Sequence, residues 1–304
     1  MKLGIMTGAI PDPEITIDGF IELAKDVERR GFASLWMANT RGHDAVTAMA
    51  IAGRETSEIE VGTAVTPIQP RHPTALAQQA LSASALARGR FTLGIGLSHK
   101  IVIEGSLGLS YAQPAKTMRE YLQILAPLLR GEGAAFRGDL YSSKIEIAMN
   151  AAVMPVPLIV AALGPMMLDL AGRYSDGTVL WMTGPRTIGQ HVVPGIGAGA
   201  KAAGRLTPRI IAGFPVVLSN NPDETRKKIS EILQVYGQLP SYRAMMDREG
   251  AATPGDIALV GDAAALDSAI LQVQEAGATE MVSVLLETDP GAKDRTMDYL
   301  QSRL

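Results

Sequence analysis

Residues 158–176, LIVAALGPMMLDLAGRYSD, are the stretch from which the fold of this chain can be inferred. An apolar run is followed by Gly164-Pro165, and the residues after Pro165 have the apolar spacing of a helix with no acidic residue in its first turn. The backbone N–H groups at the start of such a helix have no intrahelical partner, and they can hold a phosphate. The same sequence also fits a tight strand-to-helix connection without a ligand. The remainder of the sequence is therefore needed to distinguish the two interpretations.

Composition excludes several classes of protein. The chain has 304 residues, of which 47% are hydrophobic and 19% charged, enough to bury a large core. A net charge of -3 without a basic stripe argues against a nucleic-acid partner. The absence of cysteine excludes disulfides and thiolate metal sites. Because no apolar run reaches roughly 18 residues and the N-terminus does not resemble a signal peptide, we expect a cytoplasmic protein that does not cross membranes.

Short apolar runs alternate with stretches of helical spacing along the chain. Eight strand–helix units of this kind predict a (β/α)8 TIM barrel, in a single domain over residues 1–304. A doubly wound sheet is the alternative, but there a phosphate-binding turn is expected after the first strand, not the fifth. The predicted strands are 3–6, 34–38, 59–65, 91–97, the run that starts at 158, 178–182, 209–218 and 280–287.

Two segments interrupt this alternation and are interpreted as insertions. Residues 131–157 follow the fourth helix and contain FRGDLY at 136–141, which predicts a small hairpin. Residues 237–262 lie between the seventh and eighth strands and are rich in Pro and Gly. We expect both segments to line part of a substrate pocket, and their small and apolar residues suggest an uncharged, apolar small molecule.

Three of the four histidines follow predicted strands, where a barrel carries its chemistry. His43, His72 and His99 come after the second, third and fourth strands, whereas His191 lies in a helical region. A single loop histidine is more often structural than catalytic, but three at one rim favour a site. There is no H-E-x-x-H or comparable ligand pair, so we expect no dedicated metal site.

Other catalytic signatures are missing. There is no G-x-S-x-G elbow and no G-x-x-x-x-G-K-[ST] loop. Gly94 and Gly96 lie inside a predicted strand, so they are not a dinucleotide fingerprint; they indicate close backbone approach, either to packed neighbours or to a flat ligand at the barrel mouth. Trp36 and Trp181 also lie in predicted strands and are interpreted as core or barrel-wall residues.

Five motifs together carry a resemblance to a known family. They are GFASLW, VGTAVTPIQPRHP, GRFTLGIGLSH, FRGDLY and ALGPMMLDLAGRYSDGTV. In this order they resemble the bacterial luciferase-like superfamily of flavin and deazaflavin oxidoreductases, and within it the coenzyme F420-dependent subset. The motifs lie within residues 1–185, and the remainder matches by the number of its elements.

The resemblance implies where a cofactor would bind. Its ring would lie across the barrel mouth, near a non-prolyl cis peptide between Ala64 and Val65. Asn39 stands where relatives often have an acidic residue that contacts the ring. The cofactor phosphate would be held after the fifth strand. The residues that would hold it are Ala162, Leu163, Gly164, Pro165 and Met166.

The source of a catalytic proton is left open by this resemblance. Thr40 stands where many relatives have histidine, so a proton would have to come from His43, His99 or Glu104. We favour His99, because it directly follows the fourth strand. His43 could instead form a structural hydrogen bond to Asp44, which is a predicted helix N-cap.

The resemblance further implies coenzyme F420 as cofactor, with flavin mononucleotide (FMN) as the alternative. The deazaflavin would exchange a hydride between its C5 and a small organic substrate. Its anionic tail could meet Arg41, Arg71 or Lys100. Relatives commonly form dimers, so we expect a homodimer.

Three other functions stay open. An FMN-dependent luciferase-like monooxygenase would use the same phosphate site. A non-catalytic flavin- or deazaflavin-binding protein would be consistent with the missing acid and histidine after the second strand. A barrel enzyme acting on phosphorylated sugars would need a pair of acid and base residues at strand ends, and no clear pair is present.

Overall fold

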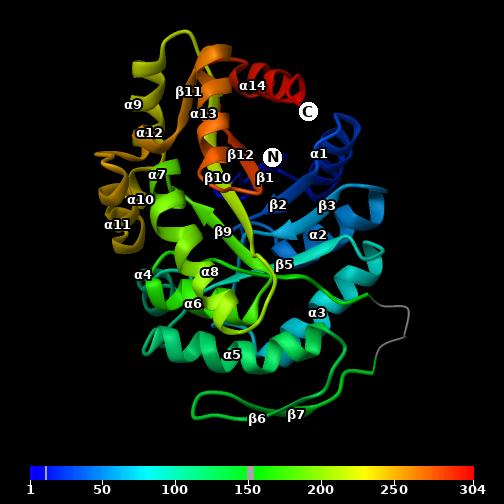
Figure 1. Cartoon of the computed structure of the whole chain (residues 1–304). Coiled ribbons are helices and arrows are strands. Elements are labelled where there is room, and N and C mark those ends of the chain that lie inside the picture. The colour runs from blue at the N-terminus through cyan, green and yellow to red at the C-terminus, as the bar shows by residue number, and fades with distance from the viewer. Residues whose placement is uncertain (11, 149–153) are drawn as a thin grey trace.

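The computed structural model describes residues 1–10, 12–148 and 154–304, and a ring of parallel strands forms its centre (Figure 1). Ten strands form one sheet, and all except β4 (Thr66–Pro67) and β11 (Leu259–Gly261) belong to the ring. Lys2 lies opposite Glu280, so the first and last strands of the ring pair and close it. The predicted (β/α)8 barrel is confirmed. The ring strands are β1 (Lys2–Thr7), β2 (Ser34–Met37), β3 (Glu60–Thr63), β5 (Phe91–Gly96), β8 (Leu158–Val160), β9 (Gly177–Trp181), β10 (Arg209–Leu218) and β12 (Glu280–Leu285).

Helices surround this ring (Figure 1). Their starts follow from local sequence: Thr16 and Asp262 each accept a hydrogen bond from a backbone N–H in the first turn of the helix that follows. Several others begin with proline, which needs no hydrogen-bond partner there. The outer helices are α1 (Ile17–Arg29), α2 (Ala45–Glu55), α3 (Pro73–Leu86), α5 (Pro114–Leu129), α6 (Pro165–Tyr174), α7 (Pro185–Thr187), the π-helical η1 (Ile188–Val192), α8 (Val193–Ala202), α9 (Pro222–Ile232), α13 (Ala263–Glu275) and α14 (Ala292–Gln301).

Both predicted insertions are present. The first contains the hairpin of β6 (Ala134–Arg137) and β7 (Ser142–Ile145), as predicted, and residues 149–153 of this segment lie outside the described residues. Glu120 on α5 holds the hairpin turn by accepting the backbone N–H groups of Leu140 and Tyr141. The second insertion is largely helical, with α10 (Gln234–Gln238), α11 (Pro240–Glu249) and α12 (Pro254–Ile257) before β11. One short helix, α4 (Lys100–Gly105), was not predicted.

An ion network crosses the barrel interior where the ring strands begin. Arg209 donates to Glu60 at 2.8 Å and to Glu280 at 2.8 Å, and Trp36 Nε1 donates to Glu280 at 3.0 Å. Because β3 and β10 are not neighbours in the ring, the Arg209–Glu60 pair has to span the interior. Glu280 is only 1% exposed, and its two oxygens are both hydrogen-bonded. Trp36 is fully buried, as the sequence predicted.

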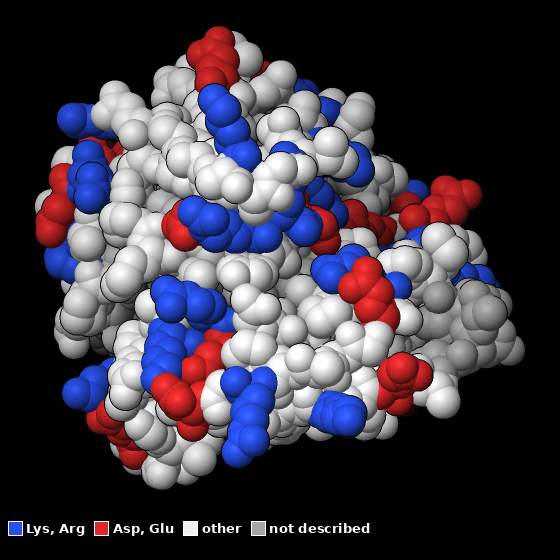
Figure 2. Space-filling model, turned by 60° about the horizontal axis from the view of Figure 1, so that its bottom comes forward, with Lys and Arg blue, Asp and Glu red and all other residues white. Residues whose placement is uncertain are grey.

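The surface carries charges of both signs. On the face in Figure 2, basic and acidic side chains are intermixed instead of forming a stripe of one sign. That there is no nucleic-acid partner stays a prediction. Within the described parts of the chain, every helix is too short or too polar to cross a bilayer.

Candidate functional site

The carboxyl ends of β2 and β3 meet at the barrel mouth. The backbone N–H of Asn39 donates to Val65 at 3.4 Å, and the Ala64–Val65 peptide bond is cis, as the resemblance implied. The Asn39 Oδ1 atom accepts the backbone N–H of Ala45 at 3.0 Å, in the first turn of α2. Its Nδ2 group forms no hydrogen bond with any described residue, so Asn39 presents a free donor beside Ala64 and Val65.

The end of β3 packs tightly on β5, and this explains the two glycines of that strand. A Cβ on Gly94 would lie 1.8 Å from the carbonyl oxygen of Thr63, and a Cβ on Gly96 would lie 2.6 Å from Val65 Cγ2. The Thr63 hydroxyl also bonds both backbone groups of Gly94, at 2.7 and 2.9 Å. Of the two interpretations of these glycines, close approach to packed neighbours is therefore confirmed.

The predicted phosphate loop leads into α6, and Gly164 is the residue before its first turn. No side chain caps this helix, and no acidic residue lies in its first turn. A Cβ on Gly164 would meet no atom within 4 Å, so the space beside this residue is open. Since the first backbone N–H groups of a helix lack intrahelical partners, the loop offers donors next to an open space.

His191 holds this loop in place, which the sequence did not reveal. It lies in η1, and its Nε2 atom donates to the carbonyl oxygen of Leu163 at 2.7 Å. The acceptor is a carbonyl, so the Nε2 atom must carry the proton. The sequence interpretation placed His191 in a helical region away from the rim. No local pattern could have indicated a contact between residues 28 positions apart.

His99 lies at the end of β5, where the sequence placed it. It precedes α4 but does not cap it, because its side chain bonds no backbone N–H of that helix. Burial lowers the pKa of His99 below its ordinary value of 6.5. At neutral pH the side chain is therefore an uncharged imidazole, which can accept one proton and donate another.

A chain of aromatic rings extends from His99 across the mouth. The rings of His99 and Tyr242 lie 5.4 Å apart, those of Tyr242 and Tyr236 5.3 Å apart, and those of Tyr236 and Trp181 5.9 Å apart. The Tyr236 hydroxyl also donates to the carbonyl oxygen of Ala9, after β1, at 3.0 Å. The second insertion therefore reaches the mouth through α11, and α10 leads into it. Tyr242 was missed, because that segment was interpreted as irregular. Tyr236 lies directly before the segment and was not singled out.

His43 is bound differently from the alternative considered in the sequence. Its Nε2 atom donates to the carbonyl oxygen of Ile15 at 3.0 Å, so the alternative of a hydrogen bond to Asp44 is not formed. Asp44 instead caps α2 by accepting Thr47 N–H at 2.9 Å, and it forms an ion pair with Arg71.

The other rim candidates are more exposed. Glu104 lies on α4, 3.7 Å from the Lys100 ammonium of the same helix, and accepts the backbone N–H of Tyr111 at 3.4 Å. No hydrogen bond within the described residues joins Glu104 to His99. Thr40 donates to the carbonyl oxygen of Gly8 at 2.9 Å and so fixes the loop after β2 to the loop after β1. Arg41 is exposed.

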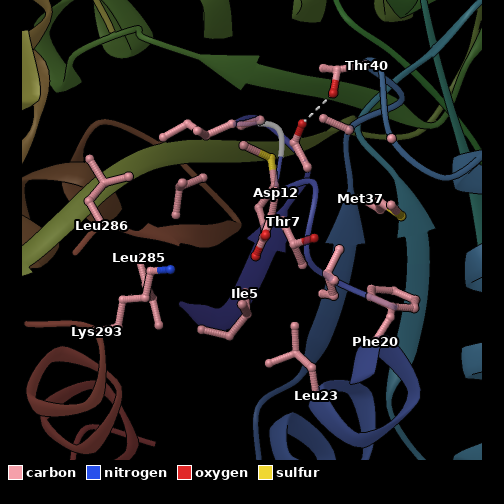
Figure 3. Close-up of a pocket in the computed structure, with 18 of the residues that line it drawn as sticks. Ile5, Thr7, Asp12, Phe20, Leu23, Met37, Thr40, Leu285, Leu286 and Lys293 are labelled. Atoms are coloured by element: carbon pink, nitrogen blue, oxygen red, sulfur yellow. Dashed lines mark hydrogen bonds between the residues drawn. The ribbon is translucent and has the colours of Figure 1, made fainter. Parts of the chain in front are cut away.

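Two cavities of about 510 Å³ each include candidate residues of this site. One is beside α6 and includes Pro165 and Met166 of the phosphate loop. The other includes Thr40 and His43 together with residues at the carboxyl ends of β1, β2 and β12, and it extends between α1 and α14 (Figure 3). The rim candidates are therefore not gathered in one cavity: His43 lines the second cavity, whereas His99 lies with the aromatic rings.

A family model described as "Luciferase-like monooxygenase" matches residues 1–281. The chain belongs to the bacterial luciferase-like family. The resemblance inferred from the five motifs is confirmed, and the protein is an enzyme of the luciferase-like oxidoreductase class.

Reductases and dehydrogenases are among the relatives of this luciferase-like chain. It is 28% identical over 242 residues to 5,10-methylenetetrahydromethanopterin reductase of Methanolobus tindarius, over 79% of this chain and 72% of the relative. It is 31% identical over 201 residues to an F420-dependent hydroxymycolic acid dehydrogenase of Mycobacterium tuberculosis, over 62% of this chain and 55% of the relative.

The fold also matches a solved structure of this class. Coenzyme F420 dependent tetrahydromethanopterin reductase from Methanopyrus kandleri superposes on the luciferase-like chain with a TM-score of 0.83. The match covers 100% of this chain and 98% of that chain, at 19% sequence identity. This likeness supports the barrel and its connections.

Proposed function

We propose that this luciferase-like enzyme is a coenzyme F420-dependent oxidoreductase that exchanges a hydride with a small organic substrate. The single observation that carries the proposal is the phosphate loop: Gly164 borders open space in front of uncapped N–H groups of α6. The sequence relatives support the choice of cofactor, since one of them is an F420-dependent dehydrogenase. The residues present fit such a group, which when bound supplies a hydride carrier at C5.

Hydrogen-bond donors lie at both ends of the proposed cofactor site. The loop of Ala162, Leu163, Gly164, Pro165 and Met166 would hold the phosphate through the backbone N–H groups at the start of α6. Asn39 would direct its free Nδ2 donor to the ring, because its Oδ1 atom is occupied by Ala45. Ala64 and Val65 would lie behind the ring. None of these contacts requires a side-chain charge.

The catalytic proton would be transferred by a side chain at the opposite side of the mouth. His99 is uncharged near neutral pH, because burial lowers its pKa. It would exchange one proton with the substrate, while the rings of Tyr242 and Tyr236 beside it exclude water from the mouth. His43 and Glu104 are weaker candidates for this role, because each is bonded to backbone away from His99.

A substitution of Gly164 tests the phosphate site directly. Gly164→Ala should leave the free protein intact, because its backbone φ of -80° suits alanine and the new Cβ meets no atom. The Cβ would occupy the space needed by the phosphate. We expect the dissociation constant for coenzyme F420, measured by fluorescence titration, to rise roughly 10–100-fold, as for the loss of one or two charge-assisted hydrogen bonds.

Gly197→Ala is the matched control, because a Cβ on Gly197 in α8 also meets nothing within 4 Å. It should leave cofactor affinity unchanged. Tight binding of FMN without affinity for coenzyme F420 would replace the proposal by an FMN-dependent monooxygenase. Binding of coenzyme F420 without single-turnover hydride transfer to any of a panel of carbonyl and enone acceptors would favour a storage protein.

A further inference from the structure

The start of α7 is capped by a residue from another helix. Its own N-cap residue is Gly184, which has no side chain, and no acidic residue lies in its first turn. The cap comes from Glu249, the last residue of α11, which packs beside α7 (Figure 1). Glu249 Oε1 accepts the backbone N–H of Arg186 at 3.1 Å, and Oε2 accepts the backbone N–H of Thr187 at 2.7 Å and its hydroxyl at 2.6 Å. One carboxylate therefore binds the free donors at this helix start.

Gly184 leaves the space that this carboxylate occupies. The three atoms nearest to a Cβ on Gly184 would all belong to Glu249, and its Cδ atom would be only 2.3 Å away. The backbone φ of Gly184 is -75°, a value that other residues adopt without strain. The glycine is therefore needed for the close approach of Glu249 and not for the backbone conformation.

The capped helix start leads directly into the turn that carries His191. The segments α7, η1 and α8 follow one another without a break from Pro185 to Ala202. Pro194, near the start of α8, has no N–H, and its ring displaces the carbonyl group one turn earlier, which explains the wide π turn. His191 lies about one turn after Thr187, which is 2% exposed. The position of the helix start therefore determines where the His191 ring meets the Leu163 carbonyl oxygen.

Helix α11 also contacts the opposite end of the proposed site. Tyr242 lies about two turns before Glu249 on this helix, and its ring is 5.4 Å from that of His99. The second insertion therefore touches His99 directly, and it reaches the phosphate loop through Glu249 and His191.

We propose that Glu249 is a positioning residue of the phosphate loop: it fixes the start of α7 and thereby holds His191 on the Leu163 carbonyl oxygen. The inference rests on the proposed function, because this loop is the site assigned to the cofactor phosphate. A cap that only stabilised α7 would change the free energy of unfolding, whereas a positioning residue also changes the hydrogen bond of His191 and, through it, cofactor affinity.

Solvent exchange of the His191 Nε2–H proton tests this link in the cofactor-free protein. Heteronuclear NMR of the histidine rings measures it, and the signal is identified by its absence in His191→Leu. We expect exchange to be about threefold faster in Glu249→Ala, because the hydrogen bond opens more often. Gly184→Ala should have the same effect, since its Cβ displaces the carboxylate, and it should add nothing in the Glu249→Ala protein. An unchanged exchange rate in both folded variants would overturn the proposal.

Cofactor affinity, from fluorescence titration, provides the second readout. Glu249→Ala should bind coenzyme F420 about threefold more weakly and should cause no further loss in the His191→Leu protein. Glu249→Gln should recover part of the loss, because its amide oxygen can still accept from Thr187. The matched control is Glu231→Gln, an exposed position on α9, which should have no effect. Losses that add in the double variant would mean that Glu249 does not act through His191.

The two readouts separate this inference from the proposed function. Faster exchange at His191, with no effect of Gly164→Ala, His191→Leu or Glu249→Ala on cofactor affinity, would reject the phosphate site and retain the link from Glu249 to His191. Affinity that falls in His191→Leu but is unchanged in Glu249→Ala would reject the positioning role alone.

Discussion

The two ends of the barrel differ in whether their polar groups have hydrogen-bond partners. Where the ring strands begin, Arg209, Glu60 and Glu280 bond one another, and Trp36 completes the network. Where the strands end, donors are left without partners among the described residues: Nδ2 of Asn39, the buried Nε1 of Trp181 and the first N–H groups of α6. Buried polar groups are normally satisfied, so the end with open donors is the one to which we assign the proposed cofactor site.

The largest effect is expected at the satisfied end. Arg209→Met removes the only partner that neutralises Glu280 in this network and leaves that carboxylate buried. We expect the free energy of unfolding, from urea denaturation, to fall by about 3–5 kcal/mol. Arg205→Met, which breaks the exposed pair with Asp176, should cost less than about 1 kcal/mol.

Cofactor affinity of the folded Arg209→Met protein adds a second readout. If the two ends are independent, the dissociation constant for coenzyme F420 should match that of the unchanged protein. A large loss of cofactor affinity together with unchanged stability would reverse the assignment of the two ends.

A smaller effect is expected at the phosphate loop. His191→Leu leaves the carbonyl of Leu163 without its donor, so the loop should lose its fixed position. We expect cofactor affinity to fall roughly 3–10-fold and the free energy of unfolding to fall by about 1 kcal/mol.

His191→Gln is the matched variant, because its amide can still donate to Leu163. It should recover most of the affinity lost in His191→Leu. Equal affinity of the two variants would mean that His191 fills space and does not position the loop.

The smallest effect is expected on the pH dependence of stability, through His99. Its pKa is lowered in the folded protein, so the unfolded chain binds more protons below pH 6.5, and stability should be lost as the pH falls through this value. In His99→Gln that part of the pH dependence should disappear. Denaturation midpoints between pH 5 and 7.5 measure it. Parallel pH profiles of the two proteins would show that His99 titrates as it does in the unfolded chain.

Much of the fold was accessible from the sequence because its signals are local. The eight ring strands, the hairpin after α5 and the cap of α2 at Asp44 follow from apolar runs and short-range hydrogen bonds. The helical content of the second insertion was missed, since its turn residues obscured α11 and α12. The short α4 was also missed, as its six residues give too little periodicity.

The site was only partly accessible, because it depends on contacts between distant residues. Asn39, Ala64 and Val65 do lie together, and Gly164 does precede an uncapped helix. The bond from His191 to Leu163 and the packing of Tyr242 on His99 join segments that no local pattern relates. The cavity between α1 and α14 likewise depends on elements that lie far apart in the chain.

The pairing of β1 with β12 also has a consequence during synthesis on the ribosome. The ring can close only after residues 280–283 have been synthesised, because they pair with residues 2–5. Until then β1 and β10 are open edges with unpaired backbone groups, which is the arrangement most prone to join strands of another chain. The nascent protein is therefore most vulnerable to aggregation just before its last ring strand emerges, and closure of the ring ends this exposure.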